Sequence, residues 1–306
     1  MEIQMIMNNY SMKKKLLLAL LLLGALSAFP LYHAFTPTKK NLAIFTAKPT
    51  QQQIQETVQS IATQGSTVVE TLAEQLTTEY EGHIANIQKE FPLVPEQWAS
   101  MRAVLEEIKS HDQLLTDNPS IPVDSHDHPF IKTIKETLAS YTIDPARVTI
   151  ELVDKPQSFM AAGQGYEKGS VRHFLRINLE AIAKKSEDVQ LAFLKHEIMH
   201  LLNYDGIEGM FIKDLLKKNG ITAEQISSSP SLIAFKKFQE YRADLLAADS
   251  PEIAASLIKD FEKVIALHPY EQVNPSHTSH PTETQRKEAV THLLSYLNAE
   301  TNTKLA

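Results

Sequence analysis

The stretch HEIMH, residues 196–200, holds the residue types best suited to chemistry in this chain. Residues four apart on a helix lie on the same side, so His196 and His200 can offer two imidazole nitrogens to one metal ion. Glu197 lies beside them and can act as general base on a water in an open fourth position of a bound zinc. Two core histidines hydrogen-bonded to the backbone are the alternative interpretation.

A third ligand is available in the stretch FQEYRADLLAA, where Glu240 lies 40 positions after His200. Asp244 follows one helical turn later, so the two carboxylates would share one face of a helix. A zinc ion needs only one of them, and the other suits a different task, holding a ligand histidine by its remaining ring N–H. Because Lys236, Lys237 and Arg242 flank the pair, a solvated charged face is the alternative.

The composition limits both the metal site and the class of protein. The 306 residues include 12 histidines and no cysteine, so thiol catalysis and disulfides are excluded and a metal site must use His, Asp and Glu. The net charge of −7 is mild and spread along the chain, which argues against a nucleic-acid partner. We therefore expect one zinc ion per chain and no nucleic acid.

The N-terminal segment 12–35 has the pattern of an export signal. Three lysines at 13–15 precede the apolar run LLLALLLLGALSAFP, which has small residues near its end. The apolar stretch comes close to spanning length, so residues 16–35 would form either a cleaved signal peptide, which we favour, or a single membrane anchor. We expect an exported protein, periplasmic or secreted, that is released or tethered once.

The rest of the chain divides at a loop rich in Pro, Asp and Ser, residues 117–129. The segment 36–120 is expected to be a linker and helical accessory region, and 121–306 to be the domain that carries the site. The loop histidines His126 and His128 form only a weak candidate metal clip, and a solvated loop is favoured. The glycine-rich stretch 163–169 is expected to be a turn.

Periodicity predicts an α+β fold that is mainly helical, with a short sheet before the HEIMH helix. Apolar spacing favours helices over 130–141, 186–204, 229–248, 250–268 and 280–300. Alternation favours strands over 147–154 and 170–179. The intervening segment 206–229 would be a core helix, which we favour, or a helical cover facing the substrate.

Three stretches in order, HEIMH, EYRAD and SHPTETQRKEAV, resemble the zinc metallopeptidases typified by the CAAX prenyl protease and the HtpX-like heat-shock peptidases. That family carries HExxH, then Glu-x-x-Ala-Asp, then His-Pro with an arginine six positions after the histidine. His280, Pro281 and Arg286 match the last motif. The resemblance covers residues 126–300 and implies a zincin-like metallopeptidase domain preceded by the accessory region. The membrane-embedded members of the family have several membrane spans, whereas this chain has at most one. The resemblance is therefore to the soluble, exported members.

The resemblance also implies a set of zinc ligands, with Glu197 as the base: His196, His200 and Glu240. His280 would stabilise the oxyanion or swing in as a fourth ligand. Arg286 would steady that loop or act beside the oxyanion, with a surface arginine as the alternative. The strand at 170–179 would lie beside the site and bind an extended polypeptide through its free edge.

Two classes of function follow from these patterns. The leading hypothesis is a zinc-dependent endopeptidase that acts on exported or envelope proteins. The alternative is a non-catalytic envelope assembly or binding factor, in which His280 closes a structural zinc site and the helices of 51–112 recruit partners. A third possibility is a latent enzyme whose N-terminal helices cover the cleft.

Overall fold

The structure is a computed structural model that describes residues 68–116, 128–154, 159–167, 169–268 and 280–305. Residues Thr78–Leu294 form one compact unit, which contains the whole candidate site. The expected signal or anchor at 12–35, the linker at 36–50 and His126 lie outside the described residues. No helix in the described ranges combines the length and the apolar character needed to cross a membrane.

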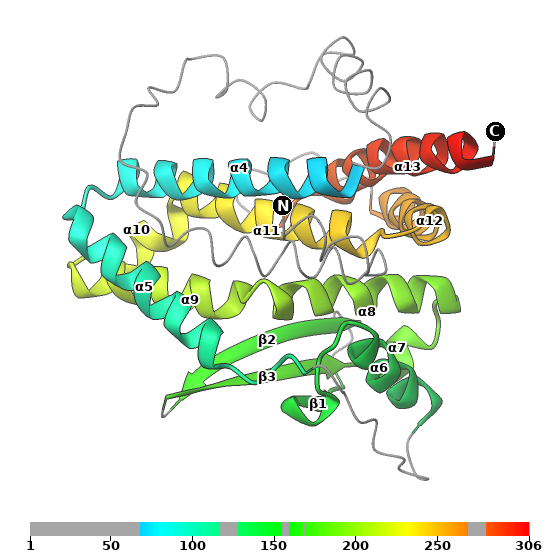
Figure 1. Ribbon diagram of the computed structural model, residues 1–306, viewed down its shortest axis with the longest axis horizontal. Helices are drawn as coiled ribbons and strands as arrows, with labels where there is room; N and C mark the ends of the chain where they lie inside the picture. The colour runs from blue at the N-terminus through cyan, green and yellow to red at the C-terminus, as the bar shows by residue number, and fades with distance from the viewer. Residues whose placement is uncertain (1–67, 117–127, 155–158, 168, 269–279, 306) are drawn as a thin grey trace, which may run out of the picture. The chain divides into compact units, whose positions relative to one another are not determined.

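Helices make up most of the described chain, together with three strands (Figure 1), which confirms the expected mainly helical α+β class. The helices before the sheet are α4 (Val68–Glu90), α5 (Pro95–His111), α6 (Pro129–Ser140) and a 3-10 turn at Pro145–Arg147. The helices after it are α7 (Leu179–Ile182), α8 (Glu187–Leu202), α9 (Asp205–Lys218), α10 (Ala223–Ser228), α11 (Pro230–Ala247), α12 (Pro251–Leu267) and α13 (Glu283–Leu305). The strands are β1 (Val148–Leu152), β2 (Met160–Glu167) and β3 (Ser170–Ile177).

The sheet has the order β1-β3-β2, with β1 parallel and β2 antiparallel to β3. Strands β1 and β3 confirm the two expected strands, but the glycine turn expected at 163–169 is wrong, because most of it lies within β2. Alanine and glycine have low strand propensity, and the full-length pairing of β2 with β3 overrides it. Gly163 packs against the Phe174 ring of β3, where a Cβ would lie 2.0 Å from the ring, so a larger residue there would require the ring to move.

The central position of β3 also corrects the expected substrate edge. Because β3 pairs with β2 along residues 170–177 and with β1 along residues 173–177, only its first three residues lack a strand partner on one side. The two edge strands are β1 and β2, and β2 is the one that lies against α8, which carries HEIMH, and against the start of α9. An extended ligand that lies beside HEIMH would therefore pair with β2.

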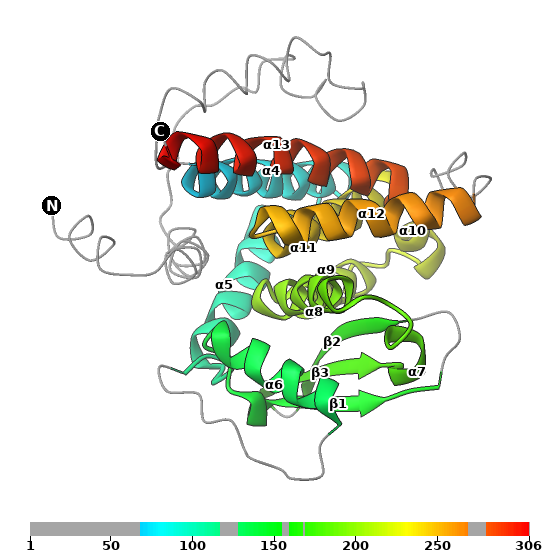
Figure 2. The same cartoon turned by 90° about the vertical axis from the view of Figure 1, so that its right-hand side faces the viewer.

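Helix α8 lies at the centre of this unit, between β2 on one side and α11 and α12 on the other (Figures 1 and 2). Its residues Leu194, Ile198 and Leu201 are fully buried, as the apolar run around HEIMH predicted. Helix α11 begins at a capped end, where the Ser229 side chain accepts the Leu232 N–H and proline occupies the first turn. The two helices that carry the candidate ligands are therefore fixed against each other by the core.

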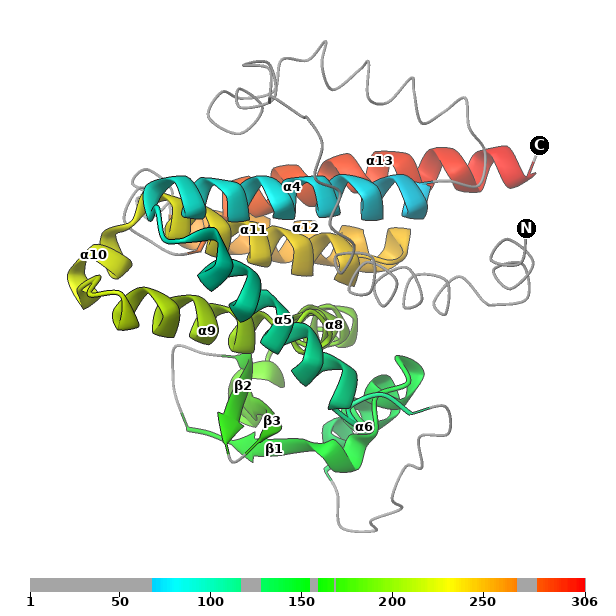
Figure 3. The ribbon, with the colours of Figure 1, turned by 60° about the vertical axis from the view of Figure 1, so that its left-hand side comes forward.

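Helix α5 belongs to the same unit as the site. It runs past α9 toward the sheet (Figure 3), and Leu105 packs with Tyr204 and Ile207. Just after its C-terminus, Asp112 lies 2.6 Å from Nε2 of His173 and accepts a hydrogen bond of 2.8 Å from the Tyr204 hydroxyl.

The segment 206–229 forms α9 and α10 with a buried apolar face, as a core helix would. His128, from the weak candidate clip, caps α6 by accepting the Phe130 N–H.

Candidate metal centre

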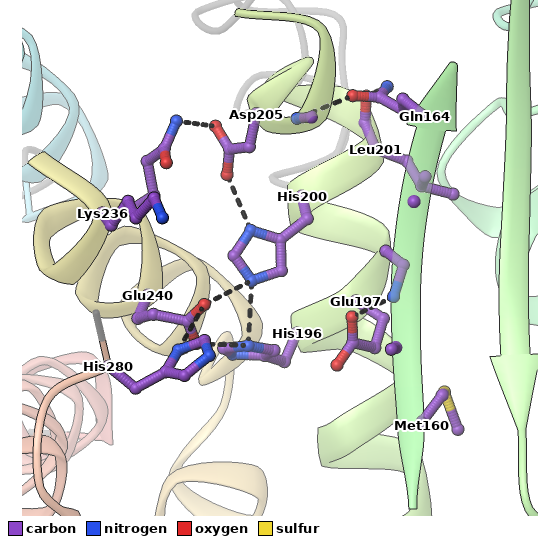
Figure 4. Close-up of a pocket in the computed structure, with 15 residues that line it drawn as sticks. Met160, Gln164, His196, Glu197, His200, Leu201, Asp205, Lys236, Glu240 and His280 are labelled. Carbon is purple, nitrogen blue, oxygen red and sulfur yellow. Dashed lines mark hydrogen bonds and ion pairs between the residues drawn. The ribbon is translucent and has the colours of Figure 1, made fainter. Parts of the chain in front are cut away.

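Two histidines and a glutamate from α8 and α11 bring their ligand atoms within 4.8 Å of one another: His196, His200 and Glu240. Nε2 of His196 lies 3.1 Å from Nε2 of His200 and 3.4 Å from Oε2 of Glu240 (Figure 4). Nε2 of His200 lies 3.7 Å from Oε1 of Glu240. Ligand atoms bound about 2.0–2.1 Å from zinc at the corners of a tetrahedron stand about 3.3–3.4 Å apart. The three side chains are therefore close enough together to share one metal ion.

The partner of His196 is a buried carboxylate. Nδ1 of His196 lies 2.9 Å from Oδ1 of Asp244, one turn after Glu240 on α11. Arg286 of α13 donates two hydrogen bonds to Asp244, from Nε and Nη2, each of 2.7 Å. Asp244 is fully buried and Arg286 is largely so, which places Arg286 as the counter-charge of this carboxylate rather than on the surface.

The partner of His200 is a carboxylate that sequence reasoning missed. Nδ1 of His200 lies 2.7 Å from Oδ2 of Asp205, the first residue of α9. Oδ1 of Asp205 accepts hydrogen bonds from Nη2 of Arg242 and from Nε2 of Gln239, the latter at 3.4 Å. Both ligand histidines therefore have the same surroundings, a carboxylate that is itself paired with an arginine, as metal-binding histidines usually do.

The chain reversal that brings Asp205 back to His200 is local. Tyr204 lies between the two helices and has a φ of 57°, in the left-handed region of backbone conformation that residues other than glycine rarely adopt. Only Asn203 and Tyr204 separate α8 from α9, so Asp205 returns to the side of α8 that carries His200. The only sequence signal for it was an aspartate shortly after HEIMH, followed by a glycine.

Glu240 has its own partner in His280. Nδ1 of His280 lies 3.1 Å from Oε1 of Glu240, while 69% of the His280 side chain is exposed. Burial by itself raises the pKa of Glu240, but hydrogen bonds from His196 and His280 outweigh it and hold the pKa well below its ordinary value. Glu240 is therefore ionised, as a metal ligand must be. His280 is not a member of the three-residue ligand group.

The surroundings of His196 favour a cation. Burial by itself lowers the pKa of this histidine, yet Asp244 and Glu240 outweigh burial and raise the pKa to about 10. Without a metal the carboxylates therefore stabilise a proton at this point, and a bound metal ion would displace that proton. The donor set and its charge thus fit a divalent cation.

Glu197 lies on the open side of the same site. Its Oε2 accepts a hydrogen bond from the Ala162 N–H of β2. Together with the three candidate ligands it lines a pocket of about 480 Å³ that is bounded by β2, α8, α9, α11 and His280. This volume lies in the range of small-molecule and peptide pockets.

No protein-family model matches this chain, and comparisons with curated proteins and with solved structures find no match. The site itself is therefore the ground on which a function can be proposed. It combines a three-residue donor set, a carboxylate held beside it and a pocket that both of them line.

Gln164 of β2 connects this strand by hydrogen bonds to the C-terminal end of α8 and to the start of α9. The Gln164 amide nitrogen donates 2.9 Å to the Leu201 carbonyl and lies 3.1 Å from Nδ1 of His173. Its Oε1 accepts the Gly206 N–H at 3.2 Å. These bonds hold β2 at a fixed place along α8, so that Ala162 reaches Glu197. Sequence reasoning did not identify Gln164 or His173.

Replacing Asp205 by Asn should lower metal affinity roughly 10-fold to 100-fold, the usual effect of removing the partner of a ligand histidine. The amide can still accept the ring N–H, but it removes the negative charge beside His200 and leaves Arg242 without its counter-charge. Competition with a chromophoric zinc chelator measures the change. The matched control is Asp214→Asn, an exposed aspartate on α9. Equal affinities in the two variants would mean that Asp205 does not support His200.

Proposed function

We propose that this chain is a zinc-dependent endopeptidase that hydrolyses peptide bonds of exported or envelope proteins. The observation that carries the proposal is the number of ligands. Structural zinc sites are usually closed by four protein ligands, whereas catalytic sites use three and keep one position open. Within the described part of the chain the group has three members, and it faces the pocket that Glu197 lines.

The proposal includes a zincin-like identity for residues 121–306 and kinship with the CAAX prenyl protease and HtpX-like peptidases. Its support is the order of the three motifs and the way their residues meet. HEIMH and EYRAD supply the ligand group, and the His-Pro motif supplies the partner of Glu240 and, through Arg286, the partner of Asp244. Export of the chain is proposed from the segment 12–35 alone.

Each residue has a stated task in this mechanism. Zinc held by His196, His200 and Glu240 would lower the pKa of a water and polarise the carbonyl that is attacked. Glu197 accepts a proton from the attacking water and passes it to the departing amine nitrogen. The Ala162 N–H holds the Glu197 carboxylate against β2.

The open side of β2 suits an extended polypeptide. Because the Ala162 N–H points to Glu197 rather than to β3, the main chain at this residue faces the pocket. Main-chain hydrogen bonds to such an edge depend little on sequence, which suits an enzyme that cleaves unfolded polypeptides. His280, exposed across the pocket with its Nδ1 on Glu240, can offer Nε2–H to the developing oxyanion.

The zinc-loaded chain should cut an unfolded protein, such as reduced and alkylated casein, into internal fragments. Removal of the metal with 1,10-phenanthroline should stop cleavage, and added zinc should restore it. Gel analysis and mass spectrometry of the fragments provide the measurement. A folded, zinc-loaded chain that cuts no polypeptide would contradict the proposal and favour the alternative of a non-catalytic factor with a structural zinc.

A further inference from the structure

Lys236 brings a positive charge into the pocket of the metal site. It lies on α11 four residues before Glu240, one helical turn away, and therefore on the same face of the helix. It lines the pocket together with Glu197, His200 and His280, and it is half-buried (Figure 4). None of the tasks described above uses it.

Within the described ranges, no carboxylate pairs with Lys236, although three carboxylates line the same pocket. Each of these is engaged elsewhere. Glu240 faces the two ligand histidines and His280, Asp205 faces His200 and Arg242, and Glu197 accepts the Ala162 N–H. The Lys236 ammonium group is thus the one cationic group of the pocket wall that no carboxylate of the described residues pairs with.

A second lysine, Lys213, makes the charged form of Lys236 less favourable. Lys213 of α9 is also half-buried and also lacks an ionic partner among the described residues. Burial lowers the pKa of Lys236, and the nearby charge of Lys213 lowers it further. A partly desolvated cation near a second positive charge is unfavourable unless an anion pairs with it. The missing component of this part of the pocket is therefore an anion.

We propose that Lys236, supported by Lys213, binds a carboxylate of the polypeptide substrate and so directs the site to acidic segments. This rests on the proposed function, since the carboxylate belongs to a chain lying in the pocket beside the reacting bond. An internal Glu or Asp side chain and the C-terminal carboxylate of a short peptide offer the same chemistry. Lys236 is a specificity-determining residue in this proposal, and it takes no part in the proton transfers.

Binding can be measured separately from cleavage. The probes are fluorescein-labelled nonapeptides of Ala, Gly and Leu that carry one Glu at each position in turn, and the same peptides with Gln. Each is made with a free or an amidated C-terminus. Fluorescence anisotropy gives the Kd for the full chain carrying Glu197→Gln, which prevents turnover, with and without zinc. The same protein is compared with the added changes Lys236→Met, Lys236→Arg, Lys213→Met and Lys218→Met.

The Glu peptide should bind roughly 10-fold to 100-fold more tightly than its Gln counterpart at one or two positions, the size expected of a charge-assisted hydrogen bond. Lys236→Met should remove this preference, Lys236→Arg should restore most of it, and Lys213→Met should reduce it. Lys218→Met, which removes an exposed lysine of α9, should leave it unchanged. A preference that follows the free C-terminus instead assigns the carboxylate to a chain end.

Equal Kd values for Glu and Gln peptides and for free and amidated ends, or no binding of any probe, would overturn the proposal. A preference that survives Lys236→Met would do so as well. Because affinity is measured without turnover, failure of the endopeptidase proposal gives a different result. In that case the carboxylate preference remains while the unmodified chain cuts no peptide.

Discussion

Replacing Glu197 by Gln is expected to lower kcat for peptide hydrolysis by about 100-fold to 10,000-fold and to leave the zinc content unchanged. The amide has the size of the carboxylate and keeps an oxygen for the Ala162 N–H, so the geometry beside β2 is preserved. It cannot accept a proton, so the attacking water is no longer activated. None of the three ligand side chains is altered, so zinc stays bound.

Two measurements check this expectation on the same preparation, namely the cleavage rate of an unfolded protein substrate and zinc per chain by elemental analysis. The matched control is Glu187→Gln, an exposed glutamate in the first turn of the same helix, which should keep both values. Full activity in Glu197→Gln with zinc in place would falsify the role of Glu197 as base. Loss of zinc in this variant would mean that Glu197 supports the metal instead.

Replacing Glu240 by Gln should weaken zinc binding by more than about 100-fold. This effect is larger than that expected for a carboxylate that only holds a ligand histidine in place, because Glu240 is itself a proposed ligand. The change removes a charged ligand and leaves His196 and His280 without the carboxylate that both of them face. The unmodified chain should hold about one zinc after dialysis against metal-free buffer. The variant should lose most of it and, with it, peptide hydrolysis.

The control for this change is Glu224→Gln on α10, where the side chain is exposed and the charge change is the same. Circular dichroism of Glu240→Gln separates loss of the metal from loss of the fold, because a variant that stays folded keeps its helical signal whether or not it holds zinc. A folded Glu240→Gln chain that retains one zinc with unchanged affinity would contradict the three-ligand site. The ligand set would then have to be sought elsewhere in the chain.

Local spacing was enough to predict the helical part of the site. The i, i+4 pair on α8 and the i, i+4 pair on α11 each define one face of one helix. The apolar residues around HEIMH indicated that its face is buried, whereas the charged residues around Glu240 and Asp244 left a solvated face as the alternative. The spacing could not show that the two faces meet. That information came only from the motif order shared with the resembled family, because contact between α8 and α11 depends on packing of the whole core.

The missed features depend on contacts far apart in the sequence. Strand β2 consists largely of small residues and forms because β3 pairs with it along its length. Asp205 reaches His200 because Tyr204 adopts a left-handed backbone conformation, and sequence patterns do not predict that conformation for a tyrosine. The bonds that Gln164 makes with Leu201 and Gly206 likewise depend on the position of β2 beside α8.

The partner carboxylates would give a bound metal ion a structural role in addition to the proposed chemical one. Its ligands would join α8 to α11, and their partners extend the connection to α9 and α13. A bound zinc would therefore cross-link four segments of a chain that has no cysteine to do so. At a zinc concentration 1,000 times its dissociation constant, such a link contributes about 4 kcal/mol to folding. The stability of the folded chain would then depend on the zinc concentration around it and would not depend on disulfide formation or reduction.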